Sequence, residues 1–428
     1  MKYNTQNDRI ATVNEKTLVV GIDIGSQKHY ARAFDNRNFE YSKKAFGFDN
    51  SEEGFEALKA WMTDIAEKNG KTKIMPAMEP TGHYWFNLGE YLQSNGMTPV
   101  HVNPHHVKKS KELDDNDPSK NDRKDPKVIA GLVTAGRFQY PYIPTGIYAE
   151  IRSLSNLRFQ TQEELTRIKN RLARWFSIYF PEYKDIYKNV DAKSGIIVLK
   201  KAPLPMDILH LGAEGINKLW RDAKLRGVGI KRAKTLFSAA EHSVGSQNAP
   251  TGARIELKIL LNDWDVYSNR LNEIMAEIER CLNEIPNIEK MLKIKGIGLI
   301  SVIGFIAEVG DLSRFNDPKQ IQKLAGFSIV EDSSGKHKGM SRISRRGRKR
   351  LRYSLYEAAI SVIAYNPEFK EIHSYYTTRP QNPLKKMQSV IAVACKLIRV
   401  FWAILTKGVE YDGERMLKDI QRPQLNAA

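Results

Sequence analysis

Residues 17–26 read TLVVGIDIGS, and this stretch decides how the first part of the chain folds. It joins a short apolar run to a carboxylate, Asp23, and then to a turn at Gly25-Ser26. A short apolar run bounded by a turn predicts a buried β-strand, and the segment 30–34 after the turn predicts its hairpin partner. We therefore expect a sheet that starts with a hairpin and has an acidic residue at the end of its first strand.

The elements that follow predict an α/β domain over residues 1–145. Apolar spacing predicts a helix over 53–68, strands over 73–78 and 97–102, and a helix over 122–134. The strand over 73–78 is followed at once by a second acid, Glu79. Because ligands of α/β sheets bind at the carboxyl ends of the strands, we expect a functional site where these strands end.

Four acids are candidates for that site: Asp23, Glu79, Asp122 and Asp125. The last two are three residues apart and would share a face of one helix. Pro126 suits only the first turn of a helix, so the helix could instead begin near Asp125. Each acid alone also fits an ordinary solvated position. As a set at strand ends they predict a site for Mg²⁺, which prefers oxygen ligands and assists phosphoryl transfer, with Mn²⁺ as the alternative.

The charge of the chain predicts a polyanionic partner. Its 428 residues include 67 Lys and Arg against 49 Asp and Glu, a formal net charge of +18, and from Pro286 onward the counts are 25 against 13. Such a concentrated surplus favours nucleic acid over a basic but inert surface. Residues 336–352 contain no acid. The cations of this segment are Lys336, Lys338, Arg342, Arg345, Arg346, Arg348, Lys349, Arg350 and Arg352.

The middle of the chain, residues 146–285, predicts long helices. Apolar residues recur with a heptad period over 151–179 and, more regularly, over 257–285. This period predicts an oligomer-forming coiled coil or a long antiparallel helix pair, and an amphipathic helix packed on its own domain is the alternative. Residues 181–251 interrupt the pattern irregularly, and we expect an inserted subdomain there.

The last part, residues 286–428, predicts a mainly helical domain with helices over 318–325, 348–364 and 383–405. It begins with Lys295-Gly296-Ile297-Gly298 between two apolar helices. Gly296 and Gly298 predict a helix-hairpin-helix turn whose exposed amides hold a DNA phosphate. A helix-capping turn explains the two glycines equally well.

We expect a cytoplasmic protein. The N-terminus is polar and lacks the apolar core of a signal peptide. The apolar stretch 390–405 is interrupted by Lys396 and Arg399, which disfavours a membrane span. The two cysteines, Cys281 and Cys395, fall in apolar helical patterns and indicate neither a disulfide framework nor a zinc site.

Taken in order, these motifs resemble the DEDD transposases of insertion sequences, which have a RuvC-like (RNase H-like) fold. The family includes Piv-type DNA invertases and bridge-RNA-guided recombinases. The first half of the resemblance, residues 17–140, rests on GIDIG at 21–25, EPTG at 79–82 and KNDRKD at 120–125. The second half, residues 286–408, rests on KGIG at 295–298, LAGF at 324–327, SGK at 334–336 and ISRRG at 343–347.

The resemblance implies that Asp23, Glu79, Asp122 and Asp125 bind the metal and that Ser334 is the nucleophile of a covalent protein–DNA phosphoester. Ser333 and Ser344 are rival nucleophiles. It further implies a composite site with acids and serine from different subunits, dimers that assemble into a tetramer, and a structured noncoding RNA that pairs with donor and target DNA.

We therefore expect a prokaryotic, nucleoid-associated DNA transposase or site-specific recombinase of a mobile element. A metal-dependent nuclease that resolves branched DNA is the main alternative, because it needs the acids but not the serine. A non-catalytic nucleic-acid-binding scaffold is a third interpretation, which clustered acids disfavour.

Overall fold

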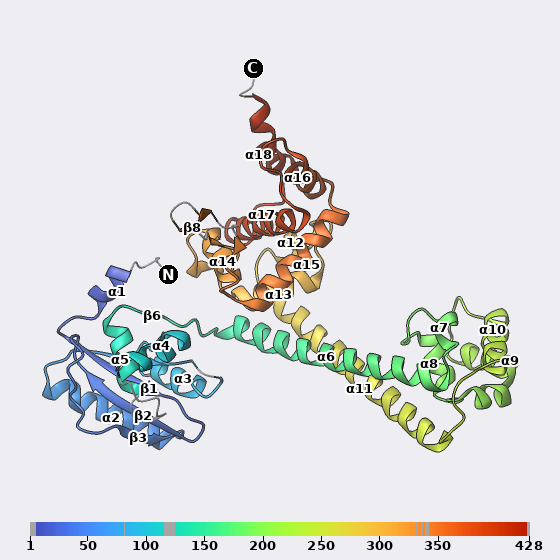
Figure 1. Cartoon of the computed structure of the whole chain (residues 1–428), viewed down its shortest axis with the longest axis horizontal. Helices are drawn as coiled ribbons and strands as arrows, with labels where there is room; N and C mark the ends of the chain where they lie inside the picture. The colour runs from blue at the N-terminus through green and yellow to red at the C-terminus, as the bar shows by residue number, and fades with distance from the viewer. Residues whose placement is uncertain are drawn as a thin grey trace. The chain divides into compact units, whose positions relative to one another are not determined.

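The computed structural model describes residues 6–80, 82–114, 125–330, 333–334, 337–338 and 342–425, with the backbone alone at 111–114, 333–334, 337–338, 419 and 421–425. The chain forms two compact units, Met1–Ile143 and Pro144–Ala428. The first is built on a sheet and the second is mainly helical (Figure 1). The expected α/β first part and helical last part are thereby confirmed.

The first unit contains a mixed six-stranded sheet with the order β3-β2-β1-β4-β5-β6. Its strands are β1 (Thr17–Asp23), β2 (Lys28–Phe34), β3 (Phe46–Asp49), β4 (Lys73–Met78), β5 (Val100–Val102) and β6 (Phe138–Gln139). The predicted hairpin is present, since β1 pairs antiparallel with β2, and β4 runs parallel to β1 on its other side. This topology is compatible with an RNase H-like domain.

Helices cover both faces of this sheet. On one face α2 (Glu52–Lys68) and α3 (Phe86–Ser94) pack against Leu18, Val20 and Ile22. On the other face α4 (Pro104–Asp114) and α5 (Asp125–Thr134) pack against Val19 and the β4 side chains of the same face. Strand β1 is apolar from Leu18 to Ile22 because both of its faces are buried there. The short helix α1 (Gln6–Thr12) precedes the sheet.

The second unit contains two long helices that run side by side in opposite directions, α6 (Gly146–Tyr179) and α11 (Pro250–Asn283) (Figure 1). Ile151 near the start of α6 shares a core with Ile274 and Ile278 of α11. At the other end the Trp175 indole Nε1 donates a hydrogen bond of 3.0 Å to the Ala253 carbonyl. The heptad pattern thus builds an antiparallel pair within one chain. The further expectation of an oligomeric coiled coil stays a prediction.

Residues between these two helices form a small helical body, which shares a core with the end of α6 and the start of α11. Its helices are α7 (Tyr183–Ile186), α8 (Lys193–Leu199), α9 (Pro205–Asp222) and α10 (Ile230–Glu241). Trp220 and Tyr183 are fully buried in this core together with Leu236. The Trp220 indole also donates a hydrogen bond of 2.8 Å to the Ser194 carbonyl, which joins α9 to α8.

The C-terminal part packs seven helices and a short 3₁₀ turn (Leu312–Arg314) around a second core. The helices are α12 (Ile288–Leu292), α13 (Leu299–Val309), α14 (Pro318–Ala325), α15 (Lys349–Tyr365), α16 (Pro367–Thr378), α17 (Lys386–Lys407) and α18 (Gly413–Leu425). Helix α17 is long and apolar enough to cross a membrane by length and composition alone. It buries Val393, Leu397 and Phe401 in this core, as a central helix of a globular domain does.

Candidate functional site

Asp23 and Glu79 leave neighbouring parallel strands at the same edge of the sheet. In the β1–β4 pairing Gly21 lies opposite Ala77 and Ile22 opposite Met78, so the next residue on each strand is an acid. Side chains alternate between the faces of a sheet. Gly21 and Ala77 lie on the face covered by α5, and the alternation places Asp23 and Glu79 on that same face.

Asp125 comes to this edge because α5 starts directly over β1. A Cβ atom on Gly21 would collide with the Pro126 carbonyl oxygen and lie 3.1 Å from the Ala130 amide nitrogen, so glycine is required for this close approach. Asp125 is the first residue of α5, only 8% exposed, and immediately precedes that contact.

The described part of α5 begins at Asp125, and residues 115–124 lie outside the described residues, so whether the helix begins near Asp125 or near Asp122 stays open. Asp122 lies outside the described residues, so a shared helix face for Asp122 and Asp125 stays untested. No three His, Cys, Asp or Glu side chains within the described ranges are gathered closely enough to hold a metal ion. The acids that are described supply carboxylate oxygens, the donor type that Mg²⁺ prefers.

The turn after Asp23 is held by a histidine that the sequence did not single out. The Gly25 amide donates a hydrogen bond of 3.2 Å to Nδ1 of His29, a buried residue of β2. Burial lowers the pKa of His29, against the opposing effects of Asn50 and Asp49. The imidazole is therefore neutral at pH 7 and accepts this bond. The only sequence signal for a buried His29 was its spacing of two residues from Ala31 and Ala33, which places all three side chains on one face of β2.

Ser333 and Ser334 form a two-residue strand of a small β-hairpin. The segment contains two antiparallel strand pairs, which we together call the serine hairpin. Its strands are β7 (Ile329–Val330), β8 (Ser333–Ser334), β9 (His337–Lys338) and β10 (Arg342–Ile343). Strand β7 pairs with β10 and β8 with β9, with Ser334 opposite His337. Ser334 is the last residue of β8, and residues 335 and 336 lie outside the described residues. The choice between Ser333 and Ser334 stays open.

Ser344, the other rival, has a structural part in the loop. Its amide donates to the Ser328 carbonyl at 2.7 Å, and its hydroxyl donates to the Gly326 carbonyl at 3.2 Å. The same hydroxyl oxygen accepts a 3.3 Å bond from the Arg346 amide. These bonds close the base of the hairpin, which explains this serine without a catalytic role.

The cations of residues 336–352 divide into two groups. Arg348 forms an ion pair of 3.3 Å with Glu308 of α13, Arg350 donates a hydrogen bond to Asn156 of α6, and Arg352 donates to the Ala325 carbonyl at 2.9 Å. These arginines fasten the segment to neighbouring helices. Four others have exposed side chains: Arg342, Arg345, Arg346 and Lys349. Lys336 and the side chain of Lys338 lie outside what the structure describes.

The two glycines before α13 have different surroundings. Gly296 has a φ of +92°, and a Cβ atom there would lie 2.9 Å from the Ser361 carbonyl oxygen of α15, so packing alone requires this glycine. Gly298 caps the N-terminus of α13 and would meet nothing within 4 Å. Packing and the positive φ explain Gly296, and the capping interpretation applies to Gly298, where a phosphate contact stays a prediction.

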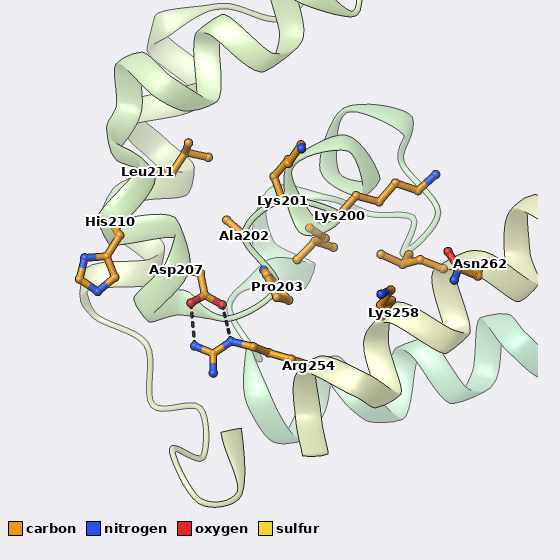
Figure 2. Close-up of a pocket in the computed structure, with 12 residues that line it drawn as sticks. Lys200, Lys201, Ala202, Pro203, Asp207, His210, Leu211, Arg254, Lys258 and Asn262 are labelled. Atoms are coloured by element: carbon orange, nitrogen blue, oxygen red, sulfur yellow. Dashed lines mark hydrogen bonds and ion pairs between the residues drawn. The ribbon is translucent and has the colours of Figure 1, made fainter. Parts of the chain in front are cut away.

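A cleft of about 770 Å³ lies elsewhere, between the α8–α9 connection and α11 (Figure 2). Its acid, Asp207, accepts bonds of 3.0 and 2.7 Å from the Arg254 guanidinium. Burial acts to raise the pKa of Asp207, but the bonds from Arg254 and the Leu204 amide outweigh it and hold that pKa below its ordinary value. Lys201 and Lys258 also line the cleft, which is therefore cationic and unsuited to a metal.

Comparison with known proteins points to one class of enzyme. Residues 20–181 match a family model described as a transposase, and residues 288–374 match the model of the transposase IS116/IS110/IS902 family. The first range contains the four predicted acids and the second contains Ser334.

Whole-length relatives have the same character. An uncharacterized 44.8 kDa protein of insertion element IS116 from Streptomyces clavuligerus is 23% identical over 404 residues, which covers 94% of this chain and 96% of the relative. An uncharacterized 42 kDa protein of insertion element IS900 from Mycobacterium paratuberculosis is 25% identical over 68% of this chain and 73% of its own length. A pilin gene-inverting protein from Moraxella bovis is 24% identical over 36% of this chain and 47% of its own length.

Proposed function

Because the chain belongs to the IS116/IS110/IS902 family of transposases, enzymes that cut and rejoin DNA strands, we propose that it recombines DNA through a serine nucleophile assisted by carboxylate-bound metal. The observation that carries the metal half is the placement of Asp23, Glu79 and Asp125 at one edge and one face of the sheet. In this proposal the sheet is a RuvC-like catalytic domain, and Asp122 completes the ligand set.

The carboxylates would hold Mg²⁺, or Mn²⁺, beside the scissile phosphate. When bound, the metal supplies positive charge that stabilises the pentacoordinate transition state of phosphoryl transfer. The residues of the chain would define where that charge lies: the strand ends hold Asp23 and Glu79, and the close contact of Gly21 with Pro126 holds the neighbouring Asp125 over β1. His29 stabilises the turn behind Asp23 without carrying charge itself.

The serine half of the proposal assigns the nucleophile to Ser334. Its Oγ would form a new ester bond to the scissile phosphorus while the bond from phosphorus to a deoxyribose oxygen breaks. The serine proton leaves and the released sugar oxygen gains one, so the phosphodiester energy is kept in a phosphoserine link. Reversal of this step on another DNA end rejoins the strands without an external energy source. Exposed cations at Arg342, Arg345, Arg346 and Lys349 would neutralise the DNA phosphates near the hairpin.

Guidance and assembly complete the proposal. We propose that a structured noncoding RNA pairs with donor and target DNA, and that dimers assemble into a tetramer in the cytoplasm. The support is the family resemblance together with the basic surface, which suits either nucleic acid.

The test is a trapping assay on the full chain. The protein would be incubated with DNA of its flanking element, the candidate noncoding RNA and Mg²⁺, then separated on a denaturing gel to detect a protein–DNA adduct. We expect the adduct to disappear in Ser334→Ala and in Asp125→Asn. Ser333→Ala is the matched control, because it removes a hydroxyl from the adjacent residue of the same strand, and it should retain the adduct.

Two other results would redirect the assignment. Cleaved DNA without any adduct, unchanged by Ser334→Ala, would refute the serine mechanism and leave a metal-dependent nuclease acting on branched DNA. An adduct lost in Ser333→Ala but kept in Ser334→Ala would move the nucleophile by one residue. Omission of the RNA tests guidance separately, since unguided protein should then form no adduct.

A further inference from the structure

A strongly basic hairpin lies in the helical body between α6 and α11. It comprises residues 218–234, the end of α9, the connection, and the start of α10, and we call it the basic hairpin. Its single acid is Asp222. Its cations are Lys218, Arg221, Lys224, Arg226, Lys231, Arg232 and Lys234.

Two of these cations hold the hairpin together. The Arg221 guanidinium donates a hydrogen bond to the Val228 carbonyl across the connection. Arg232 donates to the Ile186 carbonyl at 3.0 Å and lies over the Tyr187 ring at 4.8 Å. The remaining cations have exposed side chains, and none forms an ion pair with a residue that the structure describes. They are Lys218, Lys224, Arg226, Lys231 and Lys234.

The connection repeats the turn that precedes α13. Gly227-Val228-Gly229 corresponds to residues 296–298, and the first glycine of each turn has a positive φ, +76° at Gly227 and +92° at Gly296. The second glycine of each is the extended N-cap of the following helix. The residues four and seven positions after the second glycine are buried in both helices. They are Ala233 and Leu236 in α10 and Val302 and Phe305 in α13.

The basic hairpin is the more cationic of the two copies. Arg226 directly precedes its first glycine, and Lys231 lies two residues after its second glycine. The equivalent positions of the other turn are Lys295 and the apolar Ile300. A side chain at Gly229 would meet nothing within 4 Å, so the N-terminus of the 12-residue helix α10 is open to solvent. Free cations and unbonded helix amides on one turn are complementary to a phosphate group.

We propose that the basic hairpin is a further DNA-binding element, which holds backbone phosphates of duplex DNA without reading its sequence. Proteins that bind single strands use exposed aromatic side chains as stacking platforms. The only aromatic residue of the basic hairpin is Trp220, which is buried in the core. DNA rather than RNA is the expected duplex because the transposase family acts on DNA. The element would anchor DNA away from the predicted serine hairpin.

The test compares two double variants of the full chain by fluorescence anisotropy with a random-sequence DNA duplex. Arg226→Gln/Lys231→Gln removes two cations of the basic hairpin. Lys201→Gln/Lys258→Gln removes two exposed cations of the cleft in Figure 2 and is the matched control. We expect the hairpin variant to bind about ten-fold more weakly at ~100 mM salt and to reduce the slope of log K against log salt by about 2. The control should bind like wild type.

A third variant separates binding from folding. Gly229→Asp places a preferred N-cap residue at a backbone position that is already extended, so the thermal midpoint should stay the same or rise. Its carboxylate would repel a phosphate from the α10 amides, and duplex affinity should fall several-fold. Measurements in EDTA keep the result independent of the catalytic acids.

The proposal fails if Gly229→Asp binds duplex DNA like wild type, or if both double variants lose the same affinity, since that would indicate general electrostatics. A loss confined to single-stranded DNA or to duplex RNA would also overturn it.

Discussion

Gly21 controls how closely α5 approaches β1, and therefore where Asp125 lies. We predict that Gly21→Ala destabilises the first unit by about 1–3 kcal/mol, the range for overpacking a well-packed core, because the new Cβ would overlap the Pro126 carbonyl. Urea denaturation would measure this. Gly131→Ala in α5 is the control, because a Cβ at Gly131 would lie 3.7 Å from the nearest neighbouring atom, an ordinary contact distance. Alanine also favours the helix, so the free energy of unfolding should stay the same or rise. Equal effects of both changes would contradict the argument.

His101 on β5 makes the stability of the first unit depend on pH. Its side chain is 4% exposed and packs against Trp85, and burial lowers its pKa from 6.5 to about 4. The neutral form is favoured in the folded state, so this contribution is complete above pH 6.5 and is lost as the pH falls toward 4. The loss is about 3 kcal/mol over that range.

The measurement for His101 is urea denaturation at pH 7 and pH 4.5. His101→Phe keeps an aromatic ring beside Trp85 but removes the titrating group. The stability of this variant should therefore fall less between the two pH values than that of the wild type. The same pH dependence in both proteins would assign the effect to other groups.

At the scale of elements, the segment after the serine hairpin contains arginines with separate roles. Arg348 is 32% exposed and pairs with Glu308, which is 14% exposed, so Arg348→Gln should lower the free energy of unfolding by about 1–2 kcal/mol. Arg346 is exposed, and Arg346→Gln should weaken duplex binding a few-fold without changing stability. Thermal denaturation and anisotropy would be run on both variants. If their effects were interchanged, the division into anchoring and binding arginines would be wrong.

The elements that could be predicted are those whose own sequence shows the hydrophobic pattern of a strand or a helix. Strands β1 and β4 and helix α14 have the predicted bounds because each is an apolar run or amphipathic turn with a clear start and stop. Strands β3 and β6 could not be predicted, since they are four and two residues long and exist through hydrogen bonds to neighbouring strands. Helix α9 could not be predicted because Gly212, with a φ of +72°, interrupts the helical spacing of its apolar residues.

The site shows the same limit. The positions of Asp23 and Glu79 at strand ends could be predicted because each comes at the end of an apolar run that is visible in the sequence. That both belong to the face covered by α5 could not, because the face depends on the register between β1 and β4. The heptads of α6 and α11 likewise indicate a partner helix but not whether it belongs to the same chain.

At the scale of the whole molecule, the proposed catalytic groups are divided between the two units. Asp23, Glu79 and Asp125 belong to residues 1–143, whereas Ser334 belongs to the second unit. The apolar seam that could have joined subunits is used, at both ends, to pair α6 with α11 inside one chain. A subunit contact through these helices must therefore use their outer faces, where Ile255, Ile259 and Val266 are exposed.

This division leads to a complementation prediction, which rests on the proposed composite site. Mixing Asp125→Asn with Ser334→Ala should restore part of the protein–DNA adduct that each variant lacks alone, because a mixed assembly can join the intact acids of one subunit to the intact serine of another. The trapping assay measures the recovered adduct. Asp125→Asn mixed with Glu79→Gln is the control: every acid set in that mixture is damaged, so no adduct should form. Failure of the first mixture, with wild type active in parallel, would place acids and serine of one site in the same subunit.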